Sequence, residues 1–193
     1  MDEFSIEDSW NYFRSLSDDM TQTSRYVEPK GQDSVFSIEF AKIIILSCIE
    51  LESVFKAICA AINGNKCGNI GEYKTVILAH YPKITETLVN IPRSREKIKP
   101  FADWDKGPLF WWDAYQEVKH TRGRAFGQAS YRNAVYSLSA LYIAILYYAE
   151  IKKHDLDSIN DGGYVSSRYI SVPMVTEKLK ELPDFERRME NSQ

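Results

Sequence analysis

Reactive and aromatic side chains crowd into one stretch, WWDAYQEVKHTRGRAF, which spans residues 111–126. This stretch contains His120, one of three histidines in the chain, and the cations Lys119, Arg122 and Arg124. An imidazole titrates near neutral pH and can transfer protons, while neighbouring cations can hold a phosphate. These residue types therefore point to proton transfer at a phosphate-binding site.

A helix expected over residues 109–121 positions these groups and gives them two distinct faces, at about 100° per residue. His120 lies roughly 160° from Val118 on this helix, so we expect it on the polar side. The opposite face is predicted to point into the core and comprises Trp111, Trp112, Tyr115, Val118 and Arg122.

The polar side surrounds His120 with two acids, an amide and a guanidinium: Asp113, Glu117, Gln116 and, if the helix persists, Arg124. Either Asp113 or Glu117 can orient the imidazole ring by accepting one of its N–H groups. The alternative interpretation is a solvated histidine on an exposed face, with no function attached.

Glu50 is a second unusual residue, because its helical neighbours are apolar or small. A carboxylate is costly on such a surface unless it is paired or hydrogen-bonded. We expect its partner to be a cation of the segment 119–124 or Arg25 of the preceding loop. The alternative is a structural ion pair that fixes helix packing. Glu52 and Lys56, by contrast, are expected to form an exposed i,i+4 pair.

Helical periodicity over most of the chain predicts an all-α helical bundle with two long core helices and shorter peripheral ones. The first core helix is expected over residues 37–63, with Ser34 or Ser37 as its cap and Gly64 at its end. The second is expected over residues 130–153, capped by its own first residue.

Shorter helices are predicted over residues 6–20, 73–79, 84–89 and 174–189. For the helix at 109–121, we expect Pro108 in the first turn and Gly123 as the residue that breaks it. The whole chain, residues 1–193, is interpreted as a single domain. Its core covers about 6–154, and residues 155–193 form a peripheral connector and helix.

Composition narrows the function further. The formal net charge of −3 means that any nucleic-acid binding must rest on a local basic patch. Three cysteines without zinc-ligand spacing predict a reducing, cytoplasmic compartment. The acidic N-terminal stretch is unlike a signal peptide. The most apolar run, residues 141–149, is about half the length of a membrane span, so no membrane association is expected.

The known short motifs for cofactors are missing from the sequence. Neither a dinucleotide-binding glycine pattern nor a phosphate-binding loop is present, and the three histidines are dispersed along the chain. We therefore expect no cofactor and no metal site.

The pattern WW-x-AY-x-x-VKH-x-R-x-x-x-F, followed by a long helix, resembles the C-terminal signature of HEPN-type domains (higher eukaryotes and prokaryotes nucleotide-binding). The resemblance is strongest to bacterial members tied to abortive infection. It extends over roughly residues 10–150, including RYVEP and S-x-EF-x-x-III-LSCIELE-x-x-x-K.

This resemblance implies an all-α bundle that forms a homodimer. Catalytic members are metal-independent endoribonucleases of phage-defence, toxin–antitoxin and RNA-surveillance systems. They carry an arginine and a histidine separated by four to six intervening residues, and both subunits contribute to one cleft. The histidine corresponds to His120, but the arginine positions hold Asp113, Ala114 and Tyr115. Gln116 stands where many relatives have an asparagine or a similar polar residue.

Arg122, Arg124 or Lys119 could replace the missing arginine. His120 would then move a proton to or from the attacking 2′-hydroxyl or the leaving 5′-oxygen, and a cation would stabilise the developing phosphorane charge.

Two alternatives remain beside this ribonuclease hypothesis. One is a non-catalytic relative that binds RNA, a nucleotide or a protein encoded nearby, as a regulator or antitoxin. The other is a helical protein–protein module in which the cations only pair with Glu50, Glu52 and Asp113.

Overall fold

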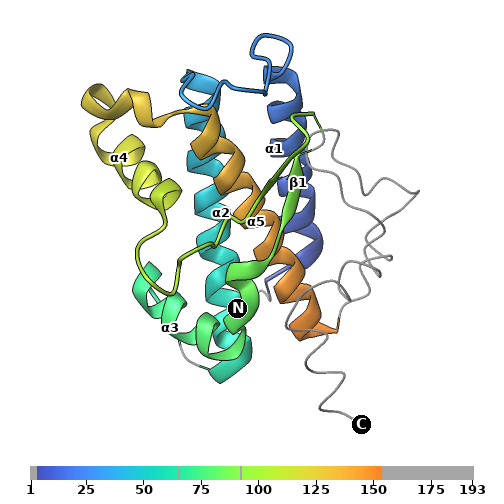
Figure 1. Ribbon diagram of the computed structural model, residues 1–193. Helices are drawn as coiled ribbons and strands as arrows, with labels where there is room; N and C mark the ends of the chain where they lie inside the picture. The colour runs from blue at the N-terminus through green and yellow to red at the C-terminus, as the bar shows by residue number, and fades with distance from the viewer. Residues whose placement is uncertain (1–3, 65, 92, 154–193) are drawn as a thin grey trace.

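Three long helices form the core of the structure, a computed structural model that describes residues 4–64, 66–91 and 93–153 but not the side chain of Arg122. They are α1 (Ile6–Thr23), α2 (Ile38–Asn63) and α5 (Tyr131–Lys152). α2 and α5 lie side by side through the middle of the bundle, and α1 packs against both (Figure 1). The predicted all-α bundle with two long core helices is confirmed.

Local signals in the sequence fix the ends of both core helices. The Ser37 hydroxyl accepts a hydrogen bond from the Phe40 backbone N–H at 3.1 Å and so caps α2. Gly64 ends α2 in the left-handed conformation, with φ of 71°. Ser130 caps α5 in the same way, accepting from the Asn133 N–H at 3.3 Å. These three predictions are therefore confirmed.

α5 is almost entirely enclosed by the bundle. By length and composition it could cross a membrane, but 83% of its most apolar window is buried inside the protein. A helix that is apolar all round is also what the centre of a helical bundle requires. α5 is therefore described as the central core helix.

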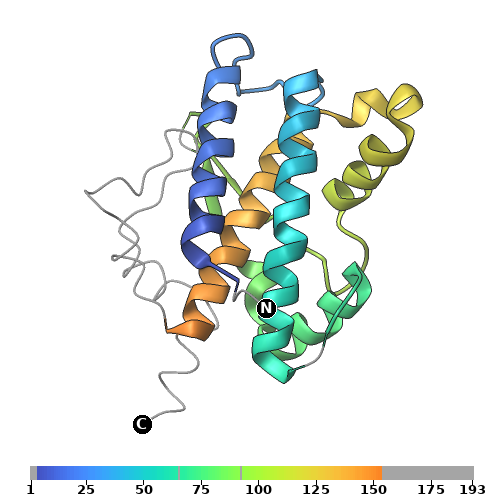
Figure 2. The ribbon, with the colours of Figure 1, turned by 180° about the vertical axis from the view of Figure 1, so that it is seen from behind.

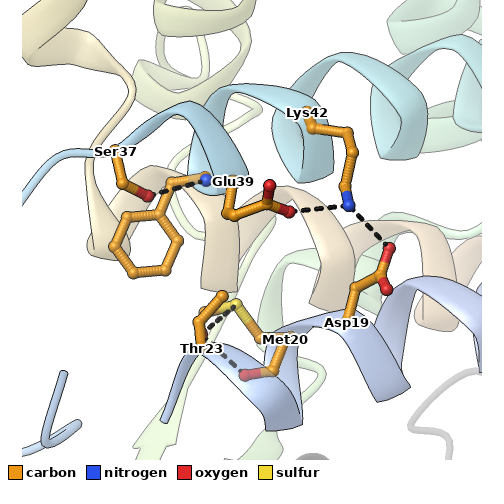
Figure 3. Close-up of polar contacts among 7 residues, drawn as sticks. Asp19, Met20, Thr23, Ser37, Glu39 and Lys42 are labelled. Atoms are coloured by element: carbon orange, nitrogen blue, oxygen red, sulfur yellow. Dashed lines mark hydrogen bonds and ion pairs between the residues drawn. The ribbon is translucent and has the colours of Figure 1, made fainter. Parts of the chain in front are cut away.

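α1 is held to the core by its apolar face and to α2 by a surface ion pair. The Phe13 ring stacks on Tyr142 of α5 with 5.3 Å between centroids. On the surface, the Lys42 ammonium lies 3.2 Å from the Asp19 carboxylate of α1 and 2.6 Å from that of Glu39 (Figure 3). Exposed pairs of this kind contribute at most about 1 kcal/mol, so burial of the apolar face dominates.

The middle of the chain forms short elements. These are α3 (Ile70–His80), the 3₁₀ helix η1 (Pro82–Glu86) and the strands β1 (Val89–Ile91) and β2 (Glu96–Ile98). The helix expected at 84–89 is only partly present: η1 includes residues 84–86, but the chain then leaves the helical conformation, and Val89 and Ile91 are buried on alternate positions of an antiparallel hairpin. Their β-branched side chains suit a strand.

α4 (Phe110–Ala125) and the 3₁₀ helix η2 (Phe126–Gln128) lie on the opposite side of the α2/α5 pair from α1, as Figures 1 and 2 show. Two expectations for this helix are wrong. Pro108 precedes the N-cap residue Leu109 and is not in the first turn. The helical geometry is lost at Thr121 rather than Gly123, with φ of −131°, and the helix then runs on to Ala125.

The peripheral connector and helix expected within residues 155–193 lie outside the described residues.

Candidate functional site

The inner face of α4 anchors the candidate site. Its four apolar side chains are all buried, as the helical periodicity predicted: Trp111, Trp112, Tyr115 and Val118. The Trp111 indole N–H donates to the Pro100 carbonyl oxygen at 2.8 Å, which satisfies the polar edge of a fully buried ring. With this face fixed, the opposite side of α4 must project into solvent.

Three residues on the outer side of α4 form what we call the cationic edge: Lys119, His120 and Arg124. All three are exposed, so the predicted position of His120 on the polar side is confirmed. None of the four ion pairs among the described residues includes any of them. The Arg122 side chain, the fourth predicted member, lies outside the described atoms.

A kink at Thr121 interrupts the helix directly after His120. The Thr121 hydroxyl donates to the Glu117 carbonyl oxygen at 2.9 Å. A threonine that bonds back by four residues competes with the helical ladder and bends the helix. The kink therefore separates His120 from Arg124, which lies in the turn beyond it.

Lys119 is linked to α2 through a tyrosine. Its ammonium lies 5.2 Å from the centroid of the Tyr115 ring and donates to the Tyr115 hydroxyl at 3.2 Å. That hydroxyl in turn donates to Glu52 Oε1 at 3.1 Å. Burial, with the Glu52 charge as a further cause, raises the pKa of Tyr115 well above its ordinary value. Glu52 therefore faces α4. The expected exposed ion pair with Lys56 is not among those of the described residues.

Glu50 lies on a different side of α2. It accepts a hydrogen bond from the Ser9 hydroxyl of α1. Burial, aided by the Glu50 charge, raises the pKa of the nearby Tyr12. The expected pairing of Glu50 with Arg25, Lys119 or Arg124 is wrong, because α1 rather than α4 covers this part of α2. Arg25 itself is exposed after the end of α1.

The acids of α4 border an open hollow of about 500 Å³. Asp113 and Glu117 line it from α4, whereas Gln116 is half-buried and is not part of its lining. Sequence reasoning missed two other charged residues of this hollow, Asp33 from the α1–α2 loop and Arg132 from α5. We call it the α4–α5 hollow.

One feature of the sequence could have identified Arg132 as unusual. It is the second residue of α5, and a cation in the first turn opposes the helix dipole. Its guanidinium carbon lies 4.4 Å from the centroid of the Phe110 ring and 5.6 Å from that of Tyr136. These cation–π contacts offset the unfavourable position and direct the guanidinium toward the start of α4.

Other site chemistry is limited in the part of the chain that the structure describes. No group of three or more histidine, cysteine, aspartate or glutamate residues there is placed to hold a metal ion. His120 lines neither the α4–α5 hollow nor the adjacent hollow of about 310 Å³, which shares Asp33 and Arg132 with it. The side chains of the cationic edge are exposed to solvent.

Comparison with known protein families, with curated proteins and with solved structures finds no match. The resemblance to HEPN-type domains accordingly rests on the sequence patterns alone.

Proposed function

We propose that this chain is a cytoplasmic HEPN-like module that acts on RNA through the cationic edge of α4, as a metal-independent endoribonuclease of a bacterial defence or toxin–antitoxin system. The observation that carries the proposal is the exposed imidazole of His120 with Lys119 before it and Arg124 beyond the kink. No described ion pair occupies any of these groups. They are therefore open to a phosphodiester.

The proposed chemistry is general acid–base catalysis. Neutral His120 would take the proton from a ribose 2′-hydroxyl as it attacks the adjacent phosphorus, or its protonated form would give a proton to the departing 5′-oxygen. Lys119 or Arg124 would stabilise the charge that develops on the phosphorane oxygens. Because the nucleophile is the 2′-hydroxyl, DNA should remain intact.

A homodimer would complete the site in this proposal. The His120 side chain is exposed in the single chain, and a solvent-exposed imidazole alone does not exclude water or hold a phosphate from several sides. A second copy of α4 would supply the opposing cations and enclose the strand. The HEPN resemblance implies the same arrangement.

The experiment is an RNA cleavage assay in EDTA with three purified full-length proteins. Wild type and His80→Ala should cleave RNA, whereas His120→Ala should not. His80 is an appropriate control because it is also an exposed histidine, at the end of α3. Equal cleavage by wild type and His120→Ala would remove the ribonuclease proposal.

The second candidate function is non-catalytic binding of RNA, and the structure offers a specific reason for it. Upstream of His120, the positions of the family arginine hold Asp113, Ala114 and Tyr115, and two of these three side chains are buried. RNA binding that depends on Lys119 and Arg124, with no cleavage by any form, would favour this candidate.

In the third hypothesis, carboxylates of Glu50, Glu52 and Asp113 saturate the cations, but no described ion pair joins any of them to Lys119 or Arg124. Glu50 is bonded to Ser9, and Glu52 reaches Lys119 only through Tyr115.

A further inference from the structure

The α4–α5 hollow differs from the cationic edge in its charge. Three carboxylates line it, Asp33, Asp113 and Glu117, against the single guanidinium of Arg132. Among the described residues, no hydrogen bond or ion pair engages these three carboxylate groups. Such a lining repels a phosphate but offers unused acceptors to a ligand that carries N–H donors.

We infer that the α4–α5 hollow is a subsite for a guanine base of the single-stranded RNA whose backbone lies on the cationic edge. This inference rests on the proposed function and adds a base preference to it. The volume of about 500 Å³ falls in the range of small-ligand sites, ~300–1,000 Å³.

The hydrogen-bond chemistry selects guanine among the four RNA bases. Guanine presents two adjacent donors, N1–H and the N2 amine, which one carboxylate can accept together. Adenine and cytosine place an amine beside a ring-nitrogen acceptor, and that acceptor would face a carboxylate oxygen unfavourably. Uracil has a single N–H between two carbonyl oxygens. Only guanine therefore matches a surface of unpaired carboxylates.

Arg132 supplies a planar surface for stacking. Its guanidinium covers one side of the Phe110 ring at 4.4 Å, and Phe110 remains 41% exposed. RNA-binding proteins stack unpaired bases on guanidinium planes as well as on aromatic rings. A base that lies on the outer side of this guanidinium would have its Watson–Crick edge within the carboxylate-lined hollow.

The hollow and the cationic edge lie along the same side of α4. Asp113, Glu117 and His120 follow one another at spacings of four and three residues, which places them on one helical stripe. The stripe covers about 10 Å from Asp113 to His120, at 1.5 Å per residue. Adjoining nucleotides of one strand can therefore place a base in the hollow and a phosphodiester at the imidazole.

A basic side chain of a protein partner is the competing occupant, since acids also attract cations. The three carboxylates attract such a cation, but the Arg132 guanidinium held over Phe110 repels it, whereas the same guanidinium offers a planar base a surface for stacking. A neutral base meets no such repulsion.

The test compares two non-cleavable 2′-O-methyl RNA octamers that differ at one position, guanosine or inosine in a run of uridine. Inosine keeps N1–H and O6 but lacks the N2 amine. Fluorescence anisotropy of wild type should give about tenfold tighter binding of the guanosine probe, as one specific base contact provides. In Asp113→Asn/Glu117→Gln this ratio should fall to near one.

The ratio separates base recognition from general electrostatics, because removing two negative charges strengthens the binding of both probes alike. Asp18→Asn/Glu86→Gln is the matched control: both residues are exposed acids outside the hollow, and the tenfold ratio should persist.

Equal affinity of wild type for the two probes, with binding still weakened by Lys119→Ala/Arg124→Ala, would overturn this inference and leave the proposed function standing. Absence of binding to both probes would overturn the proposed function and the subsite together. If a hexa-arginine peptide binds wild type but not Asp113→Asn/Glu117→Gln, while the two RNA probes bind equally, the hollow is a protein-docking site instead.

Discussion

The Tyr115 hydroxyl donates a hydrogen bond to Glu52 Oε1 at 3.1 Å and so joins α4 to α2 beneath the cationic edge. Tyr115→Phe removes this bond and leaves a half-buried carboxylate without it. We expect the free energy of unfolding to fall by about 1.5–3 kcal/mol, as for the loss of a hydrogen bond to a charged group. Urea denaturation measures the change.

The control for this substitution is Tyr26→Phe. Tyr26 is 88% exposed, so the loss of its hydroxyl should leave the midpoint unchanged. Equal stability of wild type and Tyr115→Phe would show that the link between α4 and α2 contributes nothing.

Alkaline pH should destabilise the protein through its buried tyrosines. Burial is the main cause that raises the pKa of Tyr73 to about 12 and that of Tyr115 further, from an ordinary value of 10.0. Above pH 10 the unfolded chain therefore releases protons that the folded protein retains. The stabilisation is complete below pH 10 and is lost as the pH rises toward the folded pKa values.

Tyr73→Phe should affect the protein differently at neutral and at alkaline pH. The Tyr73 hydroxyl is buried with no hydrogen-bond partner among the described residues. Removal of an unsatisfied polar group is expected to leave stability unchanged or raise it at pH 7. It should also reduce the loss between pH 10 and 12. A large loss of stability at pH 7 would show that the hydroxyl is bonded.

Gly64→Ala should destabilise the end of α2 by about 1 kcal/mol, because alanine disfavours a φ of 71°. An added Cβ would meet no atom within 4 Å, so the effect is purely conformational. Gly107→Ala, with equal space and no left-handed backbone, should have little effect on the thermal midpoint. If both substitutions lower it equally, the cap is not the cause.

The elements with strong local signals could be predicted from the sequence. Ser37 and Gly64 set the two ends of α2, and Ser130 sets the start of α5, through their own backbone and side-chain preferences. Helical periodicity correctly placed Trp111 on the buried face of α4 and His120 on the exposed face, because a helix on the surface of a bundle buries one face. The strands at 89–91 and 96–98 were missed because three residues are too few to show an alternating pattern.

The charged partners could not be predicted, because they depend on which helix covers which side of α2. Glu50 and Glu52 are two residues apart, yet one faces Ser9 of α1 and the other Tyr115 of α4. Arg132 and Asp33 meet at the α4–α5 hollow although almost a hundred positions separate them. No periodicity in the sequence encodes that contact.

RNA binding should depend on salt through the cationic edge. Each phosphate contact that is removed lowers the slope of log K against log salt by about 0.7 for a single strand. Lys119→Ala and Arg124→Ala should each reduce the slope by this amount and weaken binding regardless of sequence. Arg14→Ala, an exposed arginine on α1, should not. If all three variants have the same slope as wild type, the RNA phosphates contact other residues than Lys119 and Arg124.

The contact between RNA and α4 can be measured most directly by ultraviolet cross-linking of single-stranded RNA to the full-length protein, with mass spectrometry to locate the attached peptides. The account predicts that the cross-links fall within residues 110–136, which include Phe110, the cationic edge and Tyr136. Cross-links confined to α1 or α3, or RNA that attaches nowhere, would contradict it.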